Sequence, residues 1–335
     1  MNARPTLYAA SLLALLLLAI VALGIGRYPV SPQDIVSLLQ AKLSGAPHTV
    51  PATVEAIVFD VRGPRVLAAM LIGASLAGAG AAYQGMFRNP LVSPDILGVS
   101  AGAALGAVLA IFLSLDVFMT QSLAFAGGLA AVGLVYAVGS RMRGHDPLLA
   151  LVLTGVVIGT LLGSAIALLK YLADPHNQLP AMTFWLLGSL ASVSPADLAG
   201  ASVLSAAGLL PMVLLRWRIN LLALPDDEAR ALGVDTRRLR IVVVACATLM
   251  TAATVAISGI IGWIGLLLPH AARLLVGPQF GRLLPLAMLM GAAFMLGVDT
   301  LCRTIAPIEI PPGVLTALIG TPFFLWLFAL ARRSW

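Results

Sequence analysis

Side chains of the types that carry out chemistry are few and scattered in this sequence. Cys246 and Cys302 both fall inside apolar segments, so we interpret them as small core residues, without a disulfide or a metal site. His270 has no second ligand at i+4, and we expect a structural role for it near a helix end. The sequence contains no G-x-x-x-x-G-K-[ST] phosphate loop, no Ser/His/Asp triad and no paired intramembrane carboxylates. We therefore predict that the chain is not an enzyme, has no ATPase site of its own, and binds no metal or cofactor.

The polar residues that interrupt long apolar segments are more informative. Arg62 and Arg65 precede one such segment, and a polar break containing Gln84, Asn89 and Ser93 follows it. Breaks at membrane depth are tolerated only where protein or a water-filled cavity lies beside them. The three residues of the break are therefore candidates either for a gate or for caps of helix ends. Each arginine can pair with carboxylates through its planar fork or extend to lipid headgroups.

Composition identifies the class of protein that must position these residues. Of 335 residues, 60% are hydrophobic and only 10% are charged, and the mean hydropathy is +1.01. Ordinary soluble domains are about 25% charged, and several apolar stretches exceed the roughly 18 residues that indicate a membrane span. The first of them is too long for a signal peptide, so we interpret it as a retained span. The sequence predicts an all-α integral membrane protein with a single polytopic domain, residues 1–335.

The basic residues predict how the chain crosses the membrane. They cluster in short loops, with 14 of the 20 Lys and Arg residues on one side and 6 on the other. This bias places both termini in the cytoplasm and excludes nucleic acid as the reason for the pI near 9.9. The stretch 240–273 is too short for two full spans, so we expect a short or broken helix pair there. Ten spans fit the pattern: 7–26, 64–84, 95–115, 121–140, 148–171, 192–215, 240–258, 261–276, 284–303 and 312–331.

Two loops and several helix faces complete the prediction. Residues 27–62 form an external loop, in which Ile35, Leu38, Leu39 and Leu43 make one face of a short amphipathic helix. Residues 216–240 form the one cytoplasmic loop long enough to fold against a partner. Rows of small residues predict close helix packing: Gly73, Ala77 and Ala81; Gly102 and Gly106; Gly155 and Gly159. A secondary transporter would need ionisable residues at the bilayer midplane, whereas Lys170 and Asp299 lie near span ends.

Four motifs in order along the chain carry a family resemblance. They are RGPR with YQGMFRNPLVSPDILGVSAGA, then EARALGVD, GWIGLLLPHAARLLVG and EIPPGVLTALIGTPFF. Together they resemble the FecCD-type permeases of bacterial ABC importers. The resemblance implies a type II importer fold with about ten helices, a location in the bacterial inner membrane, and a second permease copy as a homodimer or close heterodimer. It also implies two cytoplasmic ATPase subunits, which use ATP and Mg, and an extracytoplasmic binding protein.

The resemblance also implies roles for particular residues. Arg62 and Arg65, together with Arg303, match positions at which such permeases receive the binding protein. Alternatively, Arg62 and Arg65 anchor to headgroups, and Arg303 pairs within its helix with Asp299. In the cytoplasmic loop, Glu228, Ala229 and Arg230 followed by Gly233 resemble the coupling motif that seats in a groove of the ATPase. A solvated loop is the alternative interpretation for this segment. Glu309 is interpreted as fixing the start of the last helix.

The resemblance is weakest on the cargo. Family members carry iron–siderophores, haem, cobalamin and related chelates, and we expect an iron–siderophore or similar metal chelate. Residues 173–180 and Trp263 differ from the sequences of most siderophore permeases and favour the molybdate or tungstate branch of the family instead.

Overall fold

The computed structural model describes residues 3–26, 28–45, 47, 49–141 and 147–331, and all regular structure in them is helical. Seven helices are long and apolar enough to cross a membrane, and α5, α13 and α15 are shorter apolar helices, so each of the ten predicted spans corresponds to an apolar helix. The ten are α1 (Ala3–Gly24), α4 (Gly63–Met86), α5 (Val99–Phe112), α6 (Val117–Gly139), α7 (Pro147–Leu172), α9 (Pro195–Leu214), α12 (Thr236–Ser258), α13 (Ile264–Val276), α14 (Phe280–Thr304) and α15 (Pro312–Ala331).

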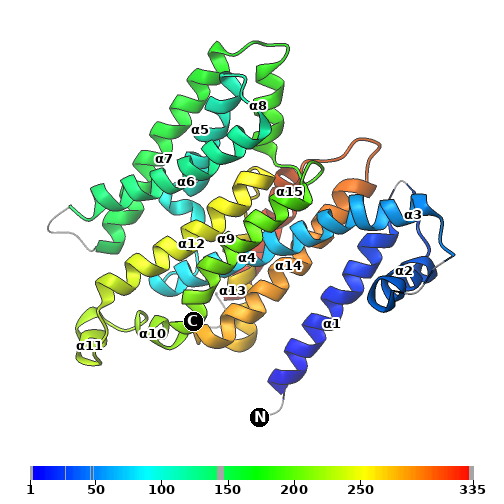
Figure 1. The fold of residues 1–335 in the computed structure, drawn as a ribbon. Helices are drawn as coiled ribbons and strands as arrows, with labels where there is room; N and C mark the ends of the chain where they lie inside the picture. The colour runs from blue at the N-terminus through cyan, green and yellow to red at the C-terminus, as the bar shows by residue number, and fades with distance from the viewer. Residues whose placement is uncertain (1–2, 27, 46, 48, 142–146, 332–335) are drawn as a thin grey trace.

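Short elements connect these helices. On the segments between the long helices lie α2 (Pro32–Ser44), α3 (Ala52–Ala56), a π-helical turn η1 (Ile57–Arg62), the 3-10 turn η2 (Pro94–Leu97), α8 (Gln178–Leu187), α10 (Arg216–Leu221) and α11 (Asp226–Ala231). Figure 1 shows that α1 begins, and α15 ends, at the end of the molecule where α10 and α11 lie. The helices α2, α3 and α8 lie at the opposite end. The predicted external and cytoplasmic loops are therefore on opposite ends of the helix bundle.

Helix α4 is the centre of the bundle. It packs against α14, α12, α13 and α9, and most of its residues are buried. A side chain at Gly73 would collide with the backbone of Gly291 on α14, and one at Gly80 would collide with Gly265 on α13. Lipid is as apolar as leucine, so helices in a bilayer associate through backbone approach of this kind. The predicted row that begins at Gly73 thus holds the central helix pair together.

Helices α5, α6 and α7 form a second group beside this centre (Figure 1). Gly102 and Gly106 on α5 allow the backbone of α6 to approach, which confirms that predicted row. Gly155 on α7 lies against the carbonyl of Ile96. A side chain at Gly159 would meet nothing within 4 Å, so the second half of the α7 row packs against no described residue of this chain. Much of α7 is exposed.

The structure differs from the prediction at three main points. The second span is continuous with α3 and η1, so that one helical run covers Ala52–Met86. Pro64 cannot donate within a helix and clashes with the preceding turn, and the π-turn before it relieves that clash. Helix α12 is full length and begins at Thr236, inside the predicted cytoplasmic loop, so only α13 is the short helix of its pair. Helix α8 was not predicted at all.

The predicted amphipathic helix exists as α2, but its apolar side faces protein. Ile35 and Leu38 are both 1% exposed and pack with Val30, Val54 and Val58. Leu39, by contrast, is 36% exposed. The side chain of Leu43 lies outside the described residues. Helix α2 is therefore a cap over the outer ends of α1 and η1 rather than a free membrane anchor.

Candidate functional site

The three arginines predicted to dock the binding protein are engaged inside the subunit, at the end of the bundle that carries α2 and α3 (Figure 1), which we call the outer end. Arg62, which is 6% exposed, lies at the end of η1 and donates to the carbonyls of Leu23 at 2.6 Å and Gly24 at 3.0 Å, and also to the carbonyl of Tyr28. The last carbonyls of a helix have no partner within it. Arg62 therefore caps the outer end of α1 and attaches it to the start of α4.

Arg65 and Arg303 share a second network with two carboxylates. The carboxylate of Asp299 is fully buried, and it pairs with Arg65 at 2.9 Å and with Arg303 at 3.2 Å. Arg65 also pairs with Glu309 at 3.0 Å, and Glu309 is 42% exposed. This network joins α4, α14 and the turn before α15. The predicted pair between Asp299 and Arg303 is present, and Glu309 holds the turn before the last helix, as expected.

These contacts define what docking would require. The side chains of Arg65 and Arg303 are only 11% and 8% exposed, and the two cations are balanced by two carboxylates. A binding protein that used Arg65 would have to replace Glu309, the exposed member of the network. Docking by Arg62, Arg65 and Arg303 stays a prediction, and it now includes an exchange of ion-pair partners.

The predicted cytoplasmic segment, which contains α10 and α11, has a different character. Helix α11 ends at Ala231 and is followed by Gly233, which has φ +80°. The N–H groups of Gly233 and Val234 donate to the carbonyls of Arg230 and Ala229, at 2.9 and 3.1 Å respectively. This pair of hydrogen bonds forms a Schellman motif, which needs a residue in the left-handed conformation. The predicted sharp turn after the helix is therefore present. Ala229 is buried, whereas Glu228 and Arg230 are exposed at the surface.

Sequence reasoning missed the residues that hold this segment in place. Asp226, the first residue of α11, accepts from Arg240 on α12 at 2.9 Å and pairs with Arg88 at 3.4 Å. Arg88, in the left-handed conformation with φ 52°, also donates to the carbonyl of Leu222 at 2.9 Å and to that of Leu224. The hydrogen bonds from Arg240 hold the pKa of the Asp226 carboxyl below its usual range. The acidic start of α11 was the available signal, since helix N-termini favour negative charge.

A third contact fixes the other helix of the segment. The side-chain oxygen of Asn220, on α10, accepts from the backbone N–H of Phe280 at 2.6 Å. Helices α10 and α11 are thus tied to the linker after α4, to α12 and to the start of α14. A force applied to this segment would act on three long helices at once.

The three gate candidates have three different environments. Gln84 is fully buried and its Nε2 donates to the carbonyl of Leu266 at 2.9 Å, so it ties α4 to α13 and does not face an open path here. Asn89 is exposed, and its side chain accepts from the N–H of Leu91 at 2.9 Å, as a turn-forming residue does. Ser93 precedes η2 but makes no side-chain capping bond. The side chain of Asn89 thus stabilises the turn between α4 and η2 rather than a helix end, and the gate and cap interpretations of the three residues stay predictions.

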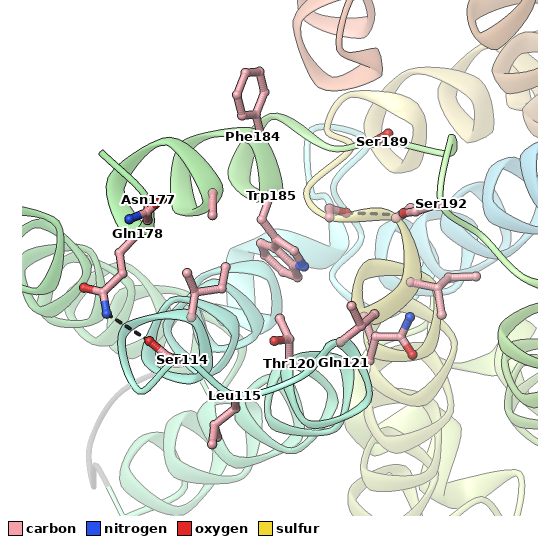
Figure 2. Close-up of a pocket in the computed structure, with 17 residues that line it drawn as sticks. Ser114, Leu115, Thr120, Gln121, Asn177, Gln178, Phe184, Trp185, Ser189 and Ser192 are labelled. Atoms are coloured by element: carbon pink, nitrogen blue, oxygen red, sulfur yellow. Dashed lines mark hydrogen bonds between the residues drawn. The ribbon is translucent and has the colours of Figure 1, made fainter. Parts of the chain in front are cut away.

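A cavity of about 510 Å³ lies at the outer end, between α8, the turn joining α5 to α6, and the end of α12. In Figure 2, the ring of Trp185 lies in the space between α8 and the α5–α6 helices, whereas the ring of Phe184, which also lines the cavity, projects in another direction. Gln178 donates to Ser114 at 3.3 Å across one side of the cavity. None of its described lining residues is charged. Uncharged polar groups can solvate a passing hydrophilic molecule without holding it.

A groove of larger volume, about 750 Å³, follows the break between α12 and α13 and continues along α15. Trp263 lines it in a conformation that bulky residues rarely adopt, with φ 72°. Its ring lies over Gly320, where no side chain could fit, and against Phe324, with ring centroids 6.2 Å apart. Such backbone strain persists only where the surroundings enforce it, and helix breaks of this kind line transport paths in other carriers.

The remaining reactive side chains lie in the packed interior. Cys246 and Cys302 are buried free thiols, as expected. His270 is 8% exposed and lies within α13. Within the part of the chain that the structure describes, no group of three His, Cys, Asp or Glu residues is placed to hold a metal ion.

Comparisons with known proteins agree with this arrangement. The profile of the FecCD transport family matches residues 13–329. The chain is 40% identical to the molybdate import system permease protein of Haemophilus influenzae, over 93% of this chain and 92% of that protein. It is 41% identical to a probable iron chelatin transport system permease protein of Helicobacter pylori, over 84% of this chain and 85% of that one.

A solved structure extends the likeness to three dimensions. It is described as a metal-chelate type ABC transporter in an inward-facing conformation, and it superposes with a TM-score of 0.88 at 38% identity. The match covers 97% of this chain and 99% of that one. The helix order and packing described above are therefore those of a known transporter fold.

Proposed function

Because this chain belongs to the FecCD transport family, we propose that it passes a metal chelate inward across the bacterial inner membrane. The chain is the permease subunit of an ABC importer and a multi-pass membrane protein. We place both termini and the α10–α11 segment in the cytoplasm, since most basic residues lie on that side. The outer cavity and the docking arginines then face the binding protein.

The observation that carries the proposal is the contrast within the cytoplasmic segment. Its inner side is fixed to the bundle through Asp226 and Asn220, while Glu228 and Arg230 are exposed on α11. A segment built in this way can receive a push from a separate ATPase and pass it to the transmembrane helices. We propose two such ATPase subunits, which bind ATP and Mg, and no ATP turnover or bound cofactor in this chain.

The second permease subunit is proposed to be another copy of the same chain. Helix α7 supports this assignment, because its described surface is largely exposed although it is one of the most apolar helices. Small and polar residues such as Thr160, Gly163 and Ser164 lie on its exposed side. They suit a helix that faces a partner subunit and a hydrated path rather than lipid alone.

An iron chelate of the siderophore type is the first candidate cargo. The uncharged lining of the outer cavity supports it, since a bulky hydrophilic chelate must pass without being held. Haem and cobalamin have the same requirement and are alternatives within this class.

A metal oxyanion, molybdate or tungstate, is the second candidate cargo. Two observations favour it. The likeness to the molybdate permease extends over nearly the full length of both chains, and the bulky side chain of Trp263 lines the groove beside α15. A bulky ring beside a transport path would favour a small ion over a chelate.

Uptake into proteoliposomes distinguishes these cargoes. The permease, its ATPase and its binding protein are reconstituted, and ATP-dependent uptake of a radiolabelled ferric siderophore is compared with that of labelled molybdate. The proposal expects the ferric chelate to accumulate. Uptake of molybdate alone would select the second cargo, and ATP-dependent uptake of neither class would contradict the proposed function. Replacing Trp263 with Ala should raise chelate uptake if this ring limits the size of the cargo.

A further inference from the structure

Two adjoining hollows on the surfaces of α6 and α12 have complementary chemistry. The first, which we name the headgroup pocket, is a cavity of about 280 Å³ at the end of the bundle where α11 lies. The second, the acyl groove, has a volume of about 490 Å³ and continues from it along the same two helices. The headgroup pocket is lined by Tyr136, Ser140, Leu148, Leu151, Asp226, Arg230, Thr236, Arg237 and Arg240. The acyl groove is lined by Leu129, Val132, Gly133, Tyr136, Ala137, Ile241, Val244, Ala245, Thr248 and Leu249.

The headgroup pocket has more cations than its own carboxylate can balance. Among the described residues, three arginines line it with one acid, Asp226, whose oxygens are already bonded by Arg240 and Arg88. Among the described residues, neither Arg230 nor Arg237 makes an ion pair or a side-chain hydrogen bond. An anion in this pocket would supply the missing negative charge.

Hydrogen-bond donors in the pocket outnumber acceptors in the same way. The Oγ1 of Thr236 and the Nε of Arg240 are buried without a partner in the described structure; these residues are 1% and 8% exposed. A phosphate diester has several acceptor oxygens, and arginine recognises them as a fork. The chemistry of the pocket therefore fits a phosphate better than a neutral or cationic group.

The acyl groove can hold the acyl chain of a lipid whose phosphate lies in the headgroup pocket. Tyr136 lines both hollows, so that the polar pocket passes directly into an apolar channel. From Arg237 to Leu249 the helix rises by about 18 Å at 1.5 Å per residue, which is near one leaflet of a hydrocarbon core about 30 Å thick. A free anion needs no such groove, and a lipid with a neutral headgroup needs no arginines.

We propose that α6 and α12 form a binding site for an anionic phospholipid, with its phosphate in the headgroup pocket and an acyl chain in the acyl groove. In the proposed orientation this site lies in the inner leaflet. Only the choice of leaflet rests on the proposed function; the site itself does not. Because Asp226 and Arg230 belong to α11, a lipid bound here also contacts the segment that faces the ATPase. The site thus places a membrane component at the joint between α11 and α12.

The test measures lipid binding to the purified full-length chain by native mass spectrometry, without any transport assay. The probes are phosphatidylglycerol, phosphatidylcholine and inorganic phosphate. Phosphatidylglycerol should bind at least tenfold more tightly than phosphatidylcholine. Arg237→Gln should weaken phosphatidylglycerol about fivefold, since a basic residue near a membrane surface attracts anionic lipid with about 1 kcal/mol. The matched control is Arg238→Gln, because Arg238 is 88% exposed and pairs only with Asp235.

A second pair of variants tests the groove. A side chain at Gly133 would meet no atom within 4 Å, so Gly133→Leu should fill the groove without disturbing the fold. It should weaken phosphatidylglycerol and leave inorganic phosphate unchanged, and Ala245→Phe, from the facing helix, should do the same. The control is Gly200→Leu, on a helix that lines neither hollow, where the space is also open.

Three results would overturn the proposal. Equal binding of the two lipids would remove the role of the arginines. Equal loss of phosphatidylglycerol binding in the Arg237 and Arg238 variants would show that general surface charge, rather than this pocket, attracts the lipid. Tight inorganic phosphate together with no effect of Gly133→Leu and Ala245→Phe would make this a site for free anions rather than lipid.

Discussion

The two ends of the bundle use the same chemistry in opposite ways. At the outer end, Asp299 and Glu309 balance two arginines, and the arginine side chains are almost completely covered. At the other end, Asp226 also binds two arginines, but it stays 31% exposed and lies beside the free charges of Glu228 and Arg230. The outer network is closed within the subunit, whereas the inner one has charges left for a partner.

This difference indicates how easily the ion pairs at each end can exchange partners. A buried ion pair that loses one partner is costly, so the outer network must be exchanged member by member. An exposed pair contributes only about 0–1 kcal/mol and can re-form freely. We therefore expect the outer end to hold the helices in register and to accept its binding protein by exchange. The inner end should accept its ATPase by addition.

The largest expected effect follows removal of the buried outer carboxylate. Asp299→Asn leaves Arg303 without a carboxylate partner and Arg65 with one, so stability should fall by about 3–5 kcal/mol. Thermal unfolding of the purified protein measures the loss. Asp227→Asn is the matched control, since Asp227 is exposed and makes no ion pair among the described residues. Equal melting of the two variants would mean that the outer network does not hold the fold.

A smaller effect is expected from the turn that ends α11. Gly233→Val forces a β-branched residue into a left-handed conformation at a cost of roughly 1–2 kcal/mol. Seating of α11 on the ATPase should weaken about five- to thirtyfold, with uptake reduced and membrane insertion unchanged. Gly200→Val is the control at an open helical position. Uptake at the wild-type rate in Gly233→Val would return α11 to the class of solvated loops.

Exchange at the outer end makes a prediction of opposite sign. Glu309→Gln removes the exposed competitor for Arg65, so docking of the binding protein should tighten about two- to fivefold. Reversal of Arg62, Arg65 and Arg303 to Glu should weaken docking and uptake together, and salt should weaken docking of the wild type. The affinity of the binding protein, measured at low and physiological salt, checks both. Looser docking in Glu309→Gln, or unchanged docking in the triple reversal, would leave these arginines a structural role only.

The smallest effect concerns pH at the inner end. The pKa of Asp226 is lowered by hydrogen bonds from Arg240. A carboxyl with a depressed pKa stabilises the folded state above its unfolded pKa, near 3.9, and this contribution is lost as the pH falls through the folded value. Hydrogen exchange over 226–234, corrected for intrinsic rates, should therefore stay constant from pH 7 to pH 5 and rise below about pH 4. Asp226→Asn should remove this dependence, and a rise of the wild type already at pH 6 would contradict it.

The architecture could be predicted from the sequence because span length and loop charge are local properties. The alternation of arginine clusters with apolar runs determines the ten helices, and Gly233 determines the turn after α11. Helix α8 was missed because its ten residues are too few for a span and include Pro180. The continuous run through η1 was missed because Pro64 usually begins a helix.

The partners of the charged residues could not be predicted in the same way. Arg65 lies 234 residues from Asp299, and no local pattern joins them. Arg88 meets the carbonyl of Leu222 only because α4 and α10 end at the same level. The grouping of arginines toward opposite ends of the bundle was therefore predictable, and the partner of each arginine required the fold.

ATP turnover tests the central claim most directly. The purified chain, free of contaminating ATPase, is assayed alone and after addition of its ATPase subunit, with Glu228→Arg as the variant of the inner surface. We predict no turnover by the chain alone, turnover linked to uptake in the complex, and loss of that link in Glu228→Arg. Turnover by the chain alone, or full coupling in the variant, would contradict the account.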